Sequence, residues 1–131
     1  MTRCAVIGAG AWGTALADLL ARNGEEVTIW ALEPGVVASI NDTNENSAFL
    51  AGARLCEGLR ATRDLPGALD GAELVCVATP SQHLRSVLRQ GAPHIAPGAT
   101  LCVASKGIEQ GTLALMGDVV VAEAPRHPVV A

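Results

Sequence analysis

The stretch Arg3-Cys-Ala-Val-Ile-Gly-Ala-Gly-Ala-Trp-Gly13 decides the fold of this chain. The apolar run from Cys4 to Ile7 has the length and the β-branched content of a buried strand. Glycines follow at the spacing G-x-G-x-x-G, and residues 14–22 then carry alanines and leucines at helical spacing. We therefore expect a strand, a tight turn and a helix in immediate succession.

Each glycine of this turn has a physical role in a nucleotide site. Gly8 permits the tight turn, Gly10 lets the backbone approach a pyrophosphate, and Gly13 lets the helix pack closely on the strand. The start of the helix offers unpaired N–H groups and the positive end of its dipole to the phosphates. The motif in this context predicts a dinucleotide site. The alternative is an ordinary strand-to-helix turn that binds no ligand.

The composition favours an α/β protein. A chain of 131 residues suits one domain with one core, and half of its residues are hydrophobic. Only 2% are aromatic, so the core must be built from Val, Leu, Ile and Ala. An aliphatic core favours an α/β sheet that helices cover on both faces. Together with the glycine motif, this predicts a Rossmann-type, doubly wound and mostly parallel sheet.

Charge and cysteine usage exclude several classes of function. A net charge of −4 without any basic run argues against nucleic-acid binding. The cysteines form no C-x-x-C and have no histidine at ligand spacing, so we expect buried thiols and no metal site. This usage suits the reducing cytoplasm. We also expect no secretory signal and no membrane span.

Strand-like and helix-like segments alternate along the rest of the chain, as repeated β-α-β units require. The expected later strands are residues 26–31, 59–62, 73–79, 100–105 and the beginning of a sixth at 129–131. The expected later helices are residues 34–40, 64–69, 80–90 and 112–124, with a polar loop over 41–47. Thr79 is placed as an N-cap and Pro80 as the first helical residue. For Thr79 and Ser81, capping alone and a ligand role both stay open.

The end of the second strand is where a dinucleotide fold selects its cofactor. An acid there binds the ribose hydroxyls of NAD, whereas a basic residue receives the 2′-phosphate of NADP. This chain offers Leu32 and Glu33, with no Arg or Lys following until Arg54. We therefore favour NAD. An equal alternative for Glu33 is a solvated residue before Pro34 that stabilises the next helix dipole.

Two further residues have alternative interpretations. Phe49, the only phenylalanine, either fills the core or packs near the cofactor, and the pattern alone favours the core. Lys106 follows an expected strand and precedes Gly107, so it either holds an anionic group in the crevice or is a solvated loop lysine, the commoner case. None of the three histidines has an acid close in sequence, so none is assigned as a catalytic base.

Together these motifs resemble the N-terminal domain of the bacterial type of NAD(P)-dependent glycerol-3-phosphate dehydrogenase. The resemblance runs in order from Ile7 to the tail. The matching segments are Val6–Ala17, Ala21–Gly24 before Val27–Trp30, Asn44–Asn46 with Phe49 and Leu50, Thr79–Ser81, and Val103–Glu109. In that family the reaction is hydride transfer between NAD(P)H and dihydroxyacetone phosphate, which gives sn-glycerol 3-phosphate for phospholipid synthesis.

The resemblance also implies roles for particular positions. Ala11 and Trp12 would contact the cofactor beside the glycines. Leu32, Glu33 and Phe49 would line its adenosine side. Lys106 would touch both cofactor and substrate, which reverses the solvated-loop interpretation.

This chain departs from the family pattern at three of these positions. The family often has Ser at position 11, and His or Arg at positions 32 and 33. The second departure argues against the use of NADP.

In the family an all-helical domain follows the sixth strand and carries the catalytic lysine. We therefore expect residues 1–131 to be an NAD(P)-binding domain without the catalytic domain, to contain no catalytic residue, and to bind a dinucleotide without turning over substrate. One alternative is a stand-alone module that binds or senses NAD(H). Another is a folded remnant that binds no ligand and associates as a homo-oligomer through exposed apolar surface.

Overall fold

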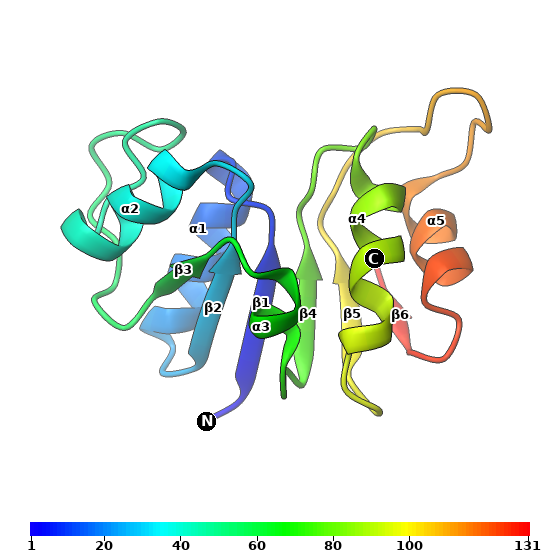
Figure 1. Ribbon diagram of the computed structural model, residues 1–131, viewed down its shortest axis with the longest axis horizontal. Helices are drawn as coiled ribbons and strands as arrows, with labels where there is room; N and C mark the ends of the chain where they lie inside the picture. Colours follow the sequence, from blue (N-terminus) through cyan, green and yellow to red (C-terminus); the bar gives the residue numbers. More distant parts are fainter.

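The computed structural model describes all 131 residues and contains one six-stranded sheet in the order β3-β2-β1-β4-β5-β6 (Figure 1). All five neighbouring strand pairs are parallel. The strands are Arg3–Ile7 (β1), Glu26–Trp30 (β2), Arg60–Thr62 (β3), Leu74–Val77 (β4), Thr100–Val103 (β5) and Val129–Val130 (β6). The chain winds outward in both directions from β1, so the Rossmann-type fold expected from the sequence is confirmed.

A helix lies between every two successive strands. They are Ala11–Arg22 (α1), Pro34–Thr43 (α2), Leu65–Leu69 (α3), Leu84–Gly91 (α4) and Met116–Glu123 (α5), with a short 3₁₀ turn over Ala92–His94 (η1). No helix combines the length and apolar character that a membrane crossing needs.

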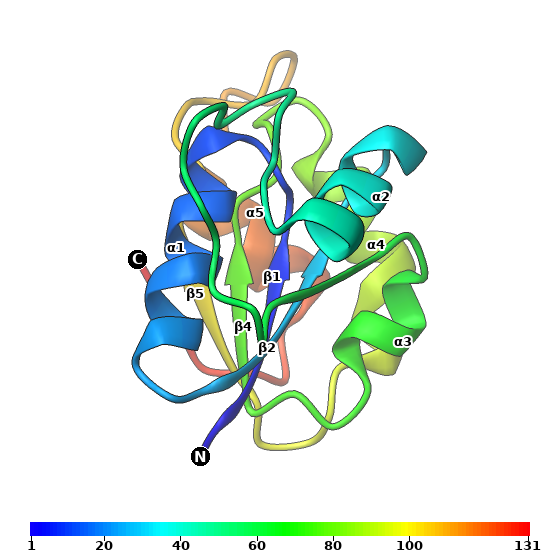
Figure 2. The same ribbon diagram turned by 90° about the vertical axis from the view of Figure 1, so that its left-hand side faces the viewer.

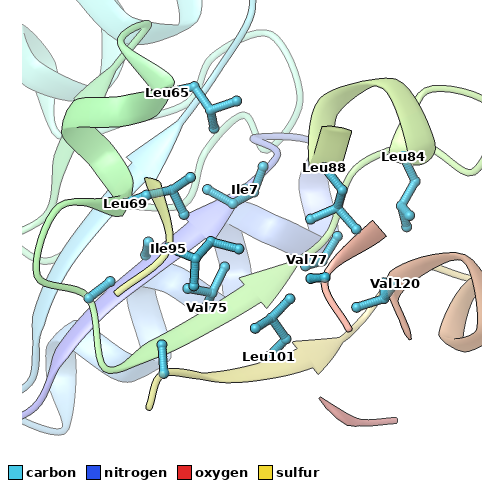
Figure 3. Packing of buried hydrophobic residues seen from close by; sticks show 14 of the residues in the cluster. Ile7, Leu65, Leu69, Val75, Val77, Leu84, Leu88, Ile95, Leu101 and Val120 are labelled. Atoms are coloured by element: carbon cyan, nitrogen blue, oxygen red, sulfur yellow. The ribbon is translucent and has the colours of Figure 1, made fainter. Parts of the chain in front are cut away.

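The core has two parts, one on each face of the sheet. On one face, the apolar side chains of β1, β4 and β5 pack against α3, α4 and α5 (Figure 3). On the other face, side chains of β1 and β2 pack against α1, α2 and the segment around Leu55 and Leu59. The central strands are therefore covered on both sides, which explains their nearly continuous apolar sequence.

The helix expected over residues 80–90 begins only at Leu84. Thr79 is not its N-cap. The Thr79 side chain is 3% exposed, and its hydroxyl donates a hydrogen bond to the carbonyl oxygen of Ile7, 3.0 Å away. The sequence pattern predicted a helix cap, but the Thr79 hydroxyl is engaged in this buried bond between the ends of β4 and β1.

Two other helix boundaries differ from the expectation. The polar run expected as a loop is helical as far as Thr43, and the side-chain amide of Asn41 exchanges two hydrogen bonds of 2.9 Å with the backbone of Ala61 on β3. The last helix, α5, begins at Met116 instead of residue 112. Gly111 and Leu113 have φ values of 87° and 59°, and this left-handed backbone is incompatible with a continuous helix.

The carboxyl ends of the strands meet at one edge of the sheet. Figure 2 shows the start of α1 and the loops that follow β4 and β5 at this same end of the molecule. Open parallel sheets bind ligands outside this edge, at the point where the strand order reverses. That point lies between β1 and β4, where the glycine turn is found.

Candidate functional site

The glycine turn brings three pieces of backbone into contact. Gly8 has a φ of 121°, and its N–H donates to the carbonyl oxygen of Trp30 at 3.0 Å. A Cβ atom on Gly8 would lie 2.6 Å from the carbonyl oxygen of Ala78, and one on Gly13 would lie 2.1 Å from the carbonyl oxygen of Gly8. Neither position has room for a side chain, so α1 starts directly against the ends of β1 and β4.

Gly10 differs from its two neighbours because it faces open space. No atom lies within 4 Å of the position that its Cβ would take. Gly10 is the N-cap of α1, yet the helix has no side-chain cap and no acid in its first turn. Its first N–H groups and the positive end of its dipole are therefore free to meet an anion, which fits the phosphate groups of a dinucleotide.

A pocket of about 260 Å³ opens on one side of this turn. The predicted adenosine-side residues Leu32, Glu33 and Phe49 all line it. The other lining residues are Gly8, Ala9, Gly10, Trp30, Thr79, Pro80, His83 and Val87. The side chain of Phe49 is 48% exposed, so the interpretation that it fills the core is wrong.

A second hollow of about 390 Å³ lies on the other side of the turn. Trp12, which is 58% exposed, and Lys106 both line it. Thr79 and Pro80 line both hollows, so the two adjoin across the end of β4. The structure thus brings all the predicted site residues to one edge of the sheet, and their contacts with a ligand stay a prediction.

Ala11 and Glu33 occupy the first positions of two helices. Ala11 is the exposed first residue of α1. Glu33 is the N-cap of α2, where its carbonyl oxygen accepts from the N–H of Val36 at 3.1 Å while its side chain makes no cap bond. The two interpretations of Glu33 are therefore compatible, because this residue begins a helix and also lines the pocket.

Asn46 is a site residue that sequence reasoning missed. Its side chain is fully buried, and its Nδ2 donates to the carbonyl oxygen of Ala9 and to Oγ1 of Thr14, both at 2.9 Å. Its Oδ1 accepts from the N–H of Phe49 at 3.2 Å. Asn46 therefore fastens the Phe49 loop to the glycine turn. In a polar run it has the pattern of a solvated turn residue.

The Lys106 loop is held by Gln82, which sequence reasoning also missed. The Gln82 Nε2 donates to the carbonyl oxygen of Ile108 at 3.1 Å, and the N–H of Gln110 donates to the Gln82 Oε1 at 3.0 Å. One amide side chain thus bridges the backbone on both sides of Glu109. No carboxylate forms an ion pair with Lys106.

A charged pair holds the same loop to α4. Nε and Nη2 of Arg85 donate to the two carboxylate oxygens of Glu109 at 2.8 and 3.0 Å, and its Nη1 donates to Glu123 on α5 at 2.9 Å. Hydrogen bonds from Arg85 and then Thr112 lower the pKa of Glu109 to about 2. Glu109 is therefore ionised at neutral pH, and this fork-to-fork geometry is a strong form of ion pair.

All four cysteines are free. Cys4 and Cys76 are buried as expected, whereas Cys102 is partly exposed. Burial, with smaller effects from Cys102 and Cys4, raises the pKa of the Cys76 thiol to about 12, so this thiol is protonated at neutral pH. No group of three or more His, Cys, Asp or Glu side chains converges on a metal-sized site.

The contact between Gly13 and Gly8 predicts the effect of a single methyl group. Gly13→Ala should lower the free energy of unfolding by about 3 kcal/mol or more, because its Cβ would overlap a backbone carbonyl that cannot move aside. Gly117→Ala on α5, where no atom lies within 4 Å, should instead raise it by about 0.5–1 kcal/mol. Urea unfolding of both variants measures the difference, and equal effects would contradict the role of close packing.

The buried amide of Asn46 predicts a cost for an isosteric change. Asn46→Asp removes both N–H donors and places a carboxylate against the carbonyl oxygen of Ala9, so it should cost about 1–3 kcal/mol of stability. The loop also loses both of its side-chain bonds to the glycine turn, so backbone hydrogen exchange over residues 46–50 should become faster. Asn23→Asp at the exposed end of α1 is the control and should cost less than about 1 kcal/mol. Unchanged exchange over residues 46–50 would refute the role of Asn46.

The ion pair predicts a local change in the Lys106 loop. Glu109→Gln leaves Arg85 with one carboxylate partner instead of two, so backbone hydrogen exchange over residues 106–112 should become faster while the melting temperature changes little. Glu123→Gln removes a carboxylate on α5 and keeps the pair with Glu109, so this loop should exchange as in the wild type. Equal exchange in both variants would show that the pair does not hold the loop.

Comparison of this sequence with known proteins identifies its family. Residues 3–131 match the family model described as NAD-dependent glycerol-3-phosphate dehydrogenase N-terminus. The chain is 50% identical over 124 residues to glycerol-3-phosphate dehydrogenase (NAD(P)+) of Caulobacter vibrioides, covering 95% of this chain and 37% of that protein. It is 49% identical over 129 residues to the protein of the same name from Paramagnetospirillum magneticum, covering 98% and 46%.

A solved structure agrees with these relatives. The crystal structure of glycerol-3-phosphate dehydrogenase from Coxiella burnetii superposes with a TM-score of 0.89 at 31% identity, covering 98% of this chain and 39% of that one. The chain thus spans less than half the length of the relatives that it matches. It belongs to the family of NAD-dependent glycerol-3-phosphate dehydrogenase N-terminal domains.

Proposed function

We propose that residues 1–131 are the NAD(P)-binding domain of a glycerol-3-phosphate dehydrogenase. The observation that carries this proposal is the uncapped start of α1 behind Gly10, which lies between two adjoining hollows. The hollow beside Leu32 and Phe49 is apolar enough for an adenine ring, and the other is lined by the cationic residue Lys106. Family membership and the names of the relatives support the same function.

The residues present suggest how each part of a dinucleotide would be held. The pyrophosphate fits the free N–H groups at Ala11 and Trp12, and the adenosine fits the pocket beside Leu32, Glu33 and Phe49. The nicotinamide end would then extend toward the hollow of Trp12 and Lys106. When bound, NAD or NADP supplies the hydride acceptor or, in its reduced form, the hydride donor.

The substrate is proposed from the charge at the far end of the site. The exposed ammonium of Lys106, which has no acidic partner, suits a phosphorylated ketone such as dihydroxyacetone phosphate. No acid–base pair lies beside Lys106 in this hollow. We therefore assign proton transfer and most substrate contacts to residues outside 1–131, and expect no turnover from these residues alone.

The wider role is proposed from the same chemistry. Reduction of dihydroxyacetone phosphate gives sn-glycerol 3-phosphate, which we propose serves phospholipid synthesis. The four free thiols suit a reducing compartment, so we propose that the protein works in the cytoplasm.

The proposal is tested by titrating the purified chain with NADH and NADPH. Saturable quenching of Trp12 and Trp30 fluorescence is expected, because each tryptophan lines one of the two hollows. Glu33→Gln removes a negative charge from the adenosine pocket, so it should strengthen NADPH binding roughly fivefold while NADH binding changes less.

Glu57→Gln is the matched control. Glu57 lies in the loop between α2 and β3 with a side chain that is 82% exposed, so its loss should leave both affinities unchanged. A folded chain that binds neither nucleotide would refute the proposed function. Equal effects of the two substitutions would refute the role of Glu33 as a selective residue.

A further inference from the structure

We propose that Arg63 receives the 2′-phosphate when this chain binds NADP. This inference rests on the proposed function, because it concerns the same adenosine pocket. It concerns a residue that neither the sequence pattern nor the resemblance selected.

Arg63 follows β3, beside the end of β2, which is the strand end where Rossmann-type folds select their cofactor. Trp30 and Thr62 are register partners in β2 and β3, and the N–H of Ala31 donates to the carbonyl oxygen of Thr62 at 3.0 Å. Arg63 follows Thr62 directly. It therefore leaves the sheet beside the segment in which β2 passes into Leu32.

Two hydrogen bonds fix Arg63 at the edge of the pocket. Its Nε donates to the carbonyl oxygen of Leu32 at 3.0 Å, and the indole N–H of Trp30 donates to the carbonyl oxygen of Arg63 at 2.9 Å. Trp30 and Leu32 both line the adenosine pocket. The guanidinium is thus anchored by one nitrogen next to that pocket, and its position does not depend on a ligand.

The rest of the guanidinium is available to an anion. The two Nη atoms of Arg63 make no hydrogen bond within the protein, and no carboxylate forms an ion pair with it. Five of the eight arginines are already paired with acids: Arg3, Arg22, Arg54, Arg85 and Arg89. A planar guanidinium edge matches the geometry of a phosphate and binds it with two parallel hydrogen bonds.

Arg63 also changes the charge at the place where Glu33 favours NAD. Along the chain, no cation stands next to Leu32 and Glu33. The parallel pairing of β2 and β3 brings Arg63 there from about thirty residues away. Glu33 therefore lines this end of the pocket while Arg63 is bonded to the backbone of the lining residue Leu32, an arrangement that admits both a free ribose hydroxyl and a 2′-phosphate.

The experiment isolates the 2′-phosphate with two adenosine nucleotides. The purified chain is titrated calorimetrically with 5′-AMP and with adenosine 2′,5′-bisphosphate, and then with NADH and NADPH. Arg63→Gln should lower the affinity for adenosine 2′,5′-bisphosphate and for NADPH about tenfold or more. The affinity for 5′-AMP and for NADH should fall less than about twofold. The salt dependence of NADPH binding should also become shallower.

Two further variants separate charge, geometry and position. Arg60→Gln removes an exposed charge from the same strand about 10 Å nearer its start, and all four affinities should stay at their wild-type values. Arg63→Lys keeps the positive charge but lacks the paired N–H donors of the guanidinium. Its affinity for NADPH should therefore be lower than that of the wild type and higher than that of Arg63→Gln. Melting temperatures identify any variant that is misfolded.

The other possible results distinguish failure of the inference about Arg63 from failure of the proposed function. Arg63→Gln could also lower the affinity for nucleotides with and without a 2′-phosphate equally, or change neither affinity. Either result would show that Arg63 does not bind that phosphate. If the wild type binds NADH and rejects NADPH, the inference fails while the proposed function stands. If the folded wild type binds none of the four nucleotides, the proposed function fails and the inference fails with it.

Discussion

The candidate site depends on two glycines, Gly8 and Gly13, which place no side chain between the start of α1 and the end of β1. The ideal Cβ of Gly13 would lie 2.1 Å from the carbonyl oxygen of Gly8, so any side chain would push the helix away from the sheet. The contact delivers the positive end of a 12-residue helix to the carboxyl edge. The ends of β1 and β4 are joined at the same point by the Thr79 hydroxyl and the N–H of Ala78, which both donate to Ile7. Both hollows are therefore placed by the geometry of this one turn.

The charged residues around this turn fall into two groups with different physical roles. Arg85 and Glu109 neutralise each other in a two-bond pair, and this pair shapes the loop that carries Lys106. Glu33, Arg63 and Lys106 have no charged partner within the chain. A charge already paired with an opposite charge has little left to offer a ligand, whereas an unpaired charge is available to neutralise one. The unpaired charges lie at the two ends of the site and the uncapped helix lies between them, which is the order that an extended, multiply charged nucleotide requires.

The sequence was sufficient for the fold because its signals are local. A β-branched run, three glycines and a helical repeat specify the first unit, and the alternation of strands and helices leaves one main way to assemble the rest. Several of the errors arose where a side chain acts at long range. Thr79 has the pattern of a helix cap, but its hydroxyl is used by a residue 72 positions away. Asn46 and Arg63 have the composition of solvated loops, and only the folded chain brings them to the turn and to the pocket edge.

The difference in burial between these residues also indicates which parts of the site can vary. Gly8, Gly13 and Asn46 lie in contacts that leave no free space, so a substitution there disturbs the sheet edge as well as the site. Leu32, Glu33 and Arg63 are exposed and contribute little to the core. Substitutions at exposed positions usually cost little stability. The proposed recognition of the pyrophosphate is therefore coupled to folding, whereas the proposed selection between NAD and NADP can change at the pocket edge without a change in the fold.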